Sequence, residues 1–264
     1  RKLMCDYKTF IQNYEKWNKI VEYVKVWWFP ETDKCHVWLI DEASKIEQEL
    51  FFNNSKEETD EFGNITITND LLEIEMDAEL ALNDTVDAYL AALYRDTGVS
   101  LADSEEHPHS LTLHRFANSK DVIGYSEQIV CKGIPVPQIN CEIAVPMLKF
   151  VEATELLHDW AKLNPHKLHY PFIYRATGES KKTKLYPSYG IKEGIAYIGF
   201  LVYLASDGSV RDDGMETMHE IQKMLAEKCN GLPHMGKHFV PEFYNFSENN
   251  KGLLDISKWR KILD

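Results

Sequence analysis

The sequence has 264 residues, of which 44% are hydrophobic and 27% are charged, a balance typical of globular rather than disordered proteins. Asp and Glu outnumber Lys and Arg by 42 to 29, which gives a formal net charge of -13. Such a surface repels phosphate groups and anionic lipids, so nucleic-acid and electrostatic membrane partners are disfavoured. No apolar run approaches the ~20 residues that span a bilayer, and no signal peptide is visible.

The first part of the chain predicts a helix followed by a β-hairpin. Apolar residues recur at helical spacing over residues 7–21. Residues 23–29 and 35–40 are rich in β-branched and aromatic side chains, and Pro30-Glu-Thr-Asp-Lys34 between them has the composition of a turn. The tryptophans of this hairpin are expected in the core rather than in a stacking platform.

The rest of the chain alternates between strand and helix patterns. The predicted elements, in order, are a polar loop at 53–69, a helix at 71–93 broken near 83–84, a loop at 99–109, strands at 111–116 and 140–145, a helix at 147–163 after Pro146, strands at 171–177 and 194–204, a helix that follows the Asp213–Glu216 capping pattern and ends near Gly231, and a helix at 254–263. The strand at 194–204 is apolar on both faces, so it belongs in the middle of a covered sheet. The sum predicts an α+β fold, with a mostly antiparallel sheet flanked by helices.

The cysteines and most histidines give little functional signal. The five cysteines lie far apart and form no Cys-x-x-Cys pair, which favours reduced, mostly buried thiols over disulfides or a zinc site. His107, His109 and His114 lie in an acidic region, where solvated surface is favoured over metal binding. No metal site is therefore predicted. Neither a dinucleotide-binding glycine motif nor a phosphate-binding loop occurs.

Residues 231–239, Gly-Leu-Pro-His-Met-Gly-Lys-His-Phe, form the most informative stretch. Glycines allow a backbone to approach a ligand, and Lys237 can place a positive charge against developing negative charge. Considered alone, the stretch is better interpreted as a polar connecting loop than as a binding site. His234 and His238 are four residues apart, like zinc ligands on a helix, but Gly236 weakens a helical interpretation.

Arg175 is a charged residue inside an apolar strand. Alternation places it on one face with Ile173 and Thr177, where its guanidinium must find an anion, water or several acceptors. It is either part of a site or a structural arginine paired with one of the many acids.

Several segments, in order along the chain, resemble the aldonolactone oxidases, a family that includes L-gulonolactone oxidase and D-arabinonolactone oxidase. The matching segments are Trp27-Trp-Phe-Pro-Glu-Thr-Asp-Lys34, Glu142-Ile-Ala-Val-Pro146, His169-Tyr-Pro-Phe-Ile-Tyr-Arg175, Leu185-Tyr-Pro-Ser188, Leu232-Pro-His-Met-Gly-Lys237 and Trp259-Arg-Lys-Ile-Leu-Asp264. Residues 50–110 match only loosely.

The resemblance implies the substrate-binding (cap) domain of a vanillyl-alcohol oxidase-type flavoenzyme, acting in reactions such as those of ascorbate biosynthesis. Residues 1–230 would form this domain, and residues 231–264 would be a C-terminal extension that returns to the flavin. The N-terminal FAD-binding domain is expected to be absent from this chain and to be its partner. The reaction would be hydride transfer from a sugar-1,4-lactone to N5 of FAD. The compartment is not indicated, and a membrane association of the parent protein would leave no sign here.

The resemblance also assigns residues. Arg175 and Lys237 fall on family residues beside flavin and substrate, where a cation stabilises the reduced flavin, and both are taken as catalytic and cofactor-binding. His234 falls on a cofactor-positioning histidine, and Ser188 and Lys237 are taken as substrate-binding. Ile173 stands where the family has glutamate, and Met235 stands where it has tryptophan.

Because Ile173 lacks a carboxylate to accept substrate hydroxyls, two alternatives stay open. One is an FAD-dependent oxidase of alditols or other alcohols with the same fold. The other is a ligand-binding or interaction module without catalysis.

Overall fold

The computed structural model describes residues 1–30, 33–63, 65–74, 121–129, 138–165, 167–168, 171–182, 186–204, 210 and 214–244. Its elements are β1 (Lys2–Asp6), α1 (Tyr7–Ile20), β2 (Tyr23–Phe29), β3 (Lys34–Ile40), α2 (Lys45–Asn54), β4 (Ser55–Thr59), β5 (Ile65–Asn69), α4 (Ser126–Ile129), β6 (Gln138–Pro146), a 3-10 turn (Met147–Lys149), α5 (Phe150–Leu163), β7 (Phe172–Thr177), β8 (Ile195–Tyr203), α6 (Gly214–Cys229), β9 (Leu232–Pro233) and a second 3-10 turn (Pro241–Phe243).

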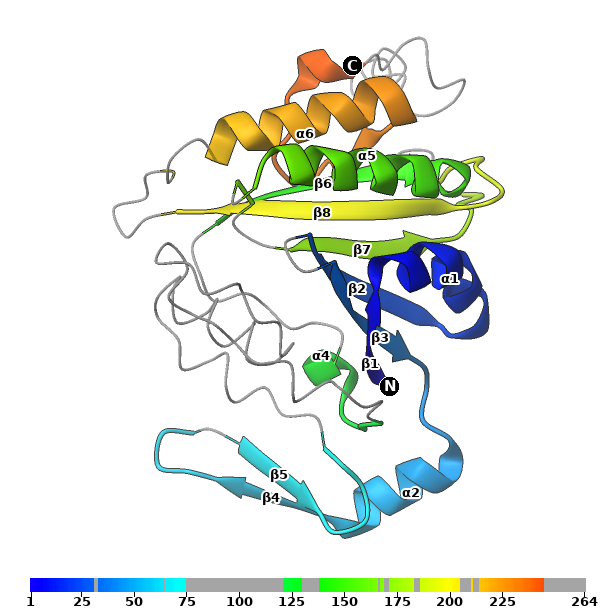
Figure 1. Cartoon of the computed structure of the whole chain (residues 1–264). Helices are drawn as coiled ribbons and strands as arrows, with labels where there is room; N and C mark the ends of the chain where they lie inside the picture. The colour runs from blue at the N-terminus through cyan, green and yellow to red at the C-terminus, as the bar shows by residue number, and fades with distance from the viewer. Residues whose placement is uncertain are drawn as a thin grey trace, which may run out of the picture.

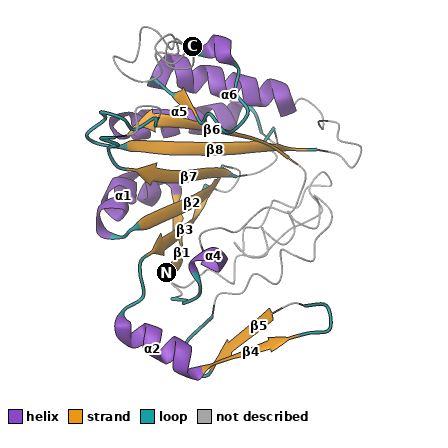
Figure 2. Cartoon of the chain, turned by 180° about the vertical axis from the view of Figure 1, so that it is seen from behind, coloured by secondary structure: helices purple, strands orange, loops and turns teal. Residues whose placement is uncertain are grey.

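Seven strands form one sheet in the order β1-β3-β2-β7-β8-β6-β9, and every neighbouring pair is antiparallel. Helices α1, α5 and α6 lie over one face of this sheet (Figure 1). Seen from behind, strands of the sheet lie in front of α1 and α5 (Figure 2). The predicted α+β class with a mostly antiparallel sheet is therefore confirmed.

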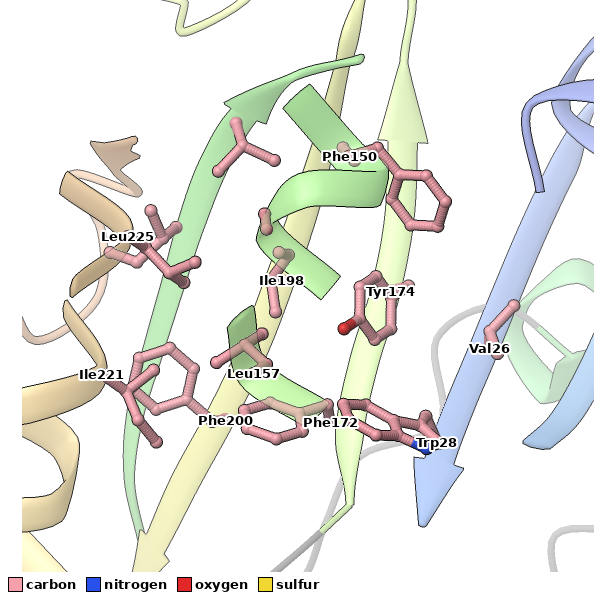
Figure 3. Packing of buried hydrophobic residues seen from close by; sticks show 14 of the residues in the cluster. Val26, Trp28, Phe150, Leu157, Phe172, Tyr174, Ile198, Phe200, Ile221 and Leu225 are labelled. Atoms are coloured by element: carbon pink, nitrogen blue, oxygen red, sulfur yellow. The ribbon is translucent and has the colours of Figure 1, made fainter. Parts of the chain in front are cut away.

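The core lies between the sheet and these three helices, as Figure 3 shows. Alternate residues of each strand point into it, since side chains on a strand alternate between faces. On β7 these are Phe172 and Tyr174, and on β8 they include Ile198 and Phe200. We call this side of the sheet the helix face, and the opposite side, which carries Arg175 and Glu142, the site face.

The predicted hairpin and the doubly apolar strand are both confirmed. Strands β2 and β3 pair from Tyr23↔Ile40 to Phe29↔Lys34, and Trp27, Trp28 and Trp38 are buried. Strand β8 is internal to the sheet, and its residues 195–202 are all buried, from both faces. The helices predicted over 7–21 and 147–163 and the helix ending near Gly231 correspond to α1, α5 and α6.

Other predictions were wrong or lie outside the described residues. The segment 53–69 was predicted as a loop, but it holds the end of α2 and the β4–β5 hairpin, which forms a separate two-stranded sheet. This hairpin is mostly polar and exposed, so no apolar alternation marked β4. Residues 71–74 form a turn and an isolated bridge rather than a helix start. The predictions for 75–120, Asp213 and 254–263 fall outside the described residues.

The candidate metal histidines His107, His109 and His114 and the cysteine Cys131 also lie outside them. Cys35, Cys141 and Cys229 are buried free thiols, and Cys5 is partly buried. Among the described helices, none combines the length and apolar character needed to cross a membrane.

Candidate functional site

Two rows of side chains cross the site face, because residues paired on neighbouring strands point to the same side. The first row runs from Ile173 on β7 through Gly199 on β8 to Glu142 on β6. The second runs from Arg175 through Tyr197 to Ala144 on the same strands. Arg175 and Glu142 are therefore two strands apart and one row apart.

The carboxylate of Glu142 joins the two cations that the resemblance selected. One of its oxygens, Oε1, accepts a 3.1 Å hydrogen bond from Nε of Arg175 and a second, short one from Nη2. Lys237 Nζ lies 3.2 Å from the other oxygen, Oε2, as an ion pair outside hydrogen-bond geometry. Arg175 and Lys237 thus converge on one group, as expected from their family positions.

Burial differs sharply across this cluster. The side chain of Glu142 is 1% exposed, whereas those of Arg175 and Lys237 are 47% and 24% exposed. A buried carboxylate without partners costs several kcal/mol, and its pairing with the two cations offsets that cost. With two positive groups and one negative group, the cluster presents one net positive charge to the solvent side.

Backbone hydrogen bonds hold Lys237 in place. The segment after α6 runs beside β6, where His234 N donates to Glu142 O at 2.8 Å and His238 N donates to Asn140 O at 2.9 Å. A turn closed by Lys237 N to His234 O at 3.0 Å lies between these two anchors. The chain around Lys237 is therefore fixed on both sides of the residue.

The two histidines of this segment point to different neighbours. His234 Nδ1 accepts from Gly236 N at 3.1 Å, and the His234 ring lies 5.9 Å from the ring of Tyr197. His238 Nε2 lies 3.2 Å from His219 Nε2 on α6. The segment is not helical, and no cluster of three metal-binding side chains occurs in the described part of the chain. The zinc-pair interpretation thus gains no support.

Tyr197 adds an aromatic wall and a protonated hydroxyl to the site face. Burial, followed by neighbouring Tyr186, raises the pKa of Tyr197, so the phenol stays protonated at neutral pH. It lies in the row of Arg175 and close to His234. Tyr197 can therefore act as a hydrogen-bond donor but not as a base.

Gly199 leaves a gap in the first row. A Cβ added there would lie 3.6 Å from Ile173 Cβ and 3.8 Å from Glu142 Oε1. Gly199 is itself buried, and its missing side chain leaves only backbone between an apolar residue and a carboxylate. Flat, partly polar ligands suit such surfaces, where the backbone can approach closely.

The structure brings together three of the four residues assigned from sequence. Arg175, Lys237 and His234 all adjoin Glu142, through its side chain or its carbonyl. Ser188 lies in the turn before β8, is fully buried, and makes no side-chain hydrogen bond within the described ranges. Its assignment to substrate binding stays a prediction.

Sequence reasoning did not select Glu142 or Tyr197. Glu142 was quoted only as part of a strand-end motif, although it is a charged residue in an apolar strand, just as Arg175 is. Two such residues of opposite charge on predicted strands were the available signal for a buried pair. Tyr197 carried no signal, because in its strand it reads only as one more apolar residue.

A comparison with protein families supports the resemblance over the whole chain. The family model described as D-arabinono-1,4-lactone oxidase matches residues 2–264. A search of curated individual proteins finds no match.

Proposed function

The chain belongs to the D-arabinono-1,4-lactone oxidase family, and from that premise we propose that it binds the substrate of an FAD-dependent sugar-1,4-lactone oxidase. The observation that carries the proposal is the convergence of Arg175 and Lys237 on Glu142. A partner FAD-binding domain would supply most contacts to the cofactor.

The residues of the site face fit a flavin ring. The ring gains electrons in the reaction, and a net positive charge beside it favours that gain. The Arg175–Glu142–Lys237 cluster has such a charge on groups that solvent reaches. Gly199 places only backbone beside it, and Tyr197 supplies an aromatic neighbour. Arg175, Lys237 and His234 are the residues that would hold the ring.

When bound, FAD supplies the hydride acceptor, and the chain's own groups orient the lactone. Lys237 and the guanidinium of Arg175 can donate hydrogen bonds to lactone oxygens, and the protonated phenol of Tyr197 offers a further donor. Glu142 is already engaged by both cations, so it is a poor base for the substrate. These groups therefore bind and orient, while the region between Ile173 and Glu142 limits the size of the ligand.

A single experiment tests the proposal. The holoprotein that contains the FAD-binding domain is mixed anaerobically with L-gulono-, L-galactono- or D-arabinono-1,4-lactone, and the flavin absorbance is followed. At least one lactone should bleach the oxidised flavin. If all three leave the flavin oxidised, the proposal is wrong.

Ile173 favours one second candidate, an alditol or other alcohol oxidase of the same fold. This half-buried residue places an apolar group next to Gly199, where the family has a carboxylate. The variant Ile173→Glu restores that acceptor for hydroxyl groups. If the natural substrate is a lactone, the variant should gain lactone turnover relative to alditol turnover. A wild-type protein that oxidises alditols and ignores lactones would support the second candidate.

A third hypothesis for the function of the chain is a binding module without catalysis. It predicts a gene that encodes no FAD-binding domain, which the reading frame upstream of Arg1 would reveal.

A further inference from the structure

We propose that Glu142 is a positioning residue of this site. Its effect on flavin binding rests on the proposed function, whereas its effect on Arg175 and Lys237 does not. Its buried carboxylate fixes the guanidinium of Arg175 and the ammonium of Lys237 relative to one another. Neither cation is tied by another ion pair among the described residues, so Glu142 alone joins β7 to the segment after β9.

The location of Glu142 suits a fixed support. It lies on β6, an interior strand that pairs with β8 along nine residues, and its own carbonyl accepts from His234 N at 2.8 Å. Both its backbone and its side chain therefore hold the segment that carries Lys237. The side chain of Glu142 is shielded from solvent, so water cannot compete for the carboxylate as it does at exposed ion pairs.

Gly199 makes the contact between strands possible. The Arg175 side chain must cross β8 to reach Glu142, and Gly199 is the β8 residue in the row of Glu142. A side chain at this position would stand within van der Waals distance of Glu142 Oε1. The glycine thus leaves the carboxylate accessible from β7.

Two explanations of Glu142 predict opposite effects on an anion that binds flavin. If Glu142 acts only through its negative charge, removing that charge strengthens the positive field and tightens sulfite binding to the flavin. If Glu142 positions the cations, removing it lets them move apart and weakens sulfite binding. In the holoprotein, Glu142→Gln should weaken sulfite binding by about tenfold, equivalent to about 1.4 kcal/mol. Tighter or unchanged sulfite binding would overturn the positioning role.

A second measurement needs no flavin. In the chain itself, acetic anhydride should modify Lys237 several-fold faster in Glu142→Gln than in the wild type, as measured by peptide mass spectrometry. Glu152→Gln is the matched control, since it breaks the exposed pair with Lys149 and should leave Lys237 unaffected. If Glu142→Gln does not fold, Glu142→Asp keeps the charge but shortens the reach and should also expose Lys237. Unchanged labelling of Lys237 overturns the proposal, whatever the lactone experiment shows.

A separate observation concerns two thiols at the edge of the sheet. Cys5 on the edge strand β1 is directly opposite Cys35 on β3, so the two side chains point to the same face of the sheet. Backbone bonds from Leu39 N to Arg1 O and from Tyr7 N to Asp33 O put the cysteines at a hydrogen-bonded pair of the ladder. Cα atoms of such pairs are about 5.5 Å apart, a common separation in disulfides.

We infer that Cys5 and Cys35 form a modification site at which hydrogen peroxide creates a disulfide. Cys5, which is partly exposed, reacts first, and its sulfur takes one oxygen of the peroxide to give a sulfenic acid and water. The sulfur of Cys35 then displaces that oxygen as a second water and forms the S–S bond. Two thiols and one peroxide thus yield one disulfide and two waters. Burial raises the pKa of the Cys35 thiol, which makes Cys35 a poor first target for the peroxide.

The test is peptide mapping of the chain after treatment with hydrogen peroxide and alkylation. A Cys5–Cys35 linked peptide should appear, and the disulfide should raise Tm by about 5–10 °C because it closes the loop over residues 6–34. In Cys35→Ser, dimedone should instead label Cys5, while the control Cys141→Ser should behave like the wild type. If Cys35 remains alkylatable after Cys5 is oxidised in the wild type, the inference is wrong.

Discussion

Consecutive residues of the same strands build two very different surfaces. On β7, Phe172 and Tyr174 are fully buried against the helices, whereas Ile173 and Arg175 point to the site face. On β6, Ile143 enters the core, and its neighbour Glu142 binds two cations. Because the two sets of side chains are separated by the sheet, substitutions on the helix face should change stability, and substitutions on the site face should mainly change function.

The largest effect is expected on the helix face. Trp28 is fully buried and stacks on Phe172 with ring centroids 5.4 Å apart. Trp28→Ala should lower the free energy of unfolding by about 3–5 kcal/mol, as large aromatic truncations do in cores. Urea denaturation of the chain measures this, with the exposed Ile20→Ala as control. A loss under about 1 kcal/mol would mean that this face is not the core.

The next-largest effect is expected on the site face, where a substitution should change activity much more than stability. Lys237→Met removes one cation but leaves Glu142 hydrogen-bonded to Arg175. Lactone-driven flavin reduction should slow by about a hundredfold or more, as when a positioned donor is removed from other active sites. The free energy of unfolding should change by only about 1 kcal/mol, because the hydrogen bonds from Arg175 keep the Glu142 carboxylate paired. Stopped-flow absorbance and urea denaturation measure the two values, and Lys149→Met is the control. Equal losses of stability and activity would contradict the separation.

A pH effect should arise from His36, which lies beside Trp27 and Trp38 of the hairpin. His36 is buried and its Nε2 accepts from Trp38 Nε1 at 2.9 Å, and burial, followed by Lys2, lowers the pKa of His36 well below its usual value. The unfolded chain takes up this proton near pH 6.5, whereas the folded chain does not. The free energy of unfolding should therefore fall as pH drops below about 6.5, by up to about 1.4 kcal/mol per pH unit, and this residue should have no effect above it.

The variant His36→Asn tests that assignment, since its amide oxygen can still accept from Trp38. Urea denaturation at pH 7.5 and at pH 5 should show a smaller loss of stability in the variant than in the wild type. Identical losses in both proteins would assign the pH dependence to other groups.

The smallest effect on folding is expected at Gly199. A Cβ there meets its neighbours at ordinary distances, and Gly→Ala reduces the entropy of the unfolded chain. Gly199→Ala should leave the free energy of unfolding within about 1 kcal/mol of the wild type or raise it. Because the methyl group would stand against Ile173 and Glu142 on the site face, lactone turnover should fall several-fold. A steady-state assay checks this, and unchanged turnover would place the ligand elsewhere.

The sequence predicted those elements whose structure depends on residues nearby in the chain, and it missed those that depend on distant residues. The β2–β3 hairpin and β8 were predictable because short runs of β-branched, aromatic and other apolar residues specify buried strands. The β4–β5 hairpin was not, since Lys56, Glu57 and Glu58 give the composition of a loop, and only its pairing with β5 makes β4 a strand.

The candidate site was also only partly predictable from the sequence. Arg175 and Lys237 were selected by motif resemblance, and their convergence was expected. The group that joins them was not, because Glu142 is 33 residues before Arg175 in the chain and meets it only through the β7–β8–β6 order of the sheet. Strand order is a long-range property that the spacing of residues along one strand does not specify.

The most direct test of the account is a crystal structure of the flavin-loaded holoprotein. We expect the flavin ring on the site face, with the Arg175 guanidinium or the Lys237 ammonium within hydrogen-bond distance of it and both still bound to Glu142. A flavin that lies against another part of the molecule, with neither cation in contact, would contradict the account.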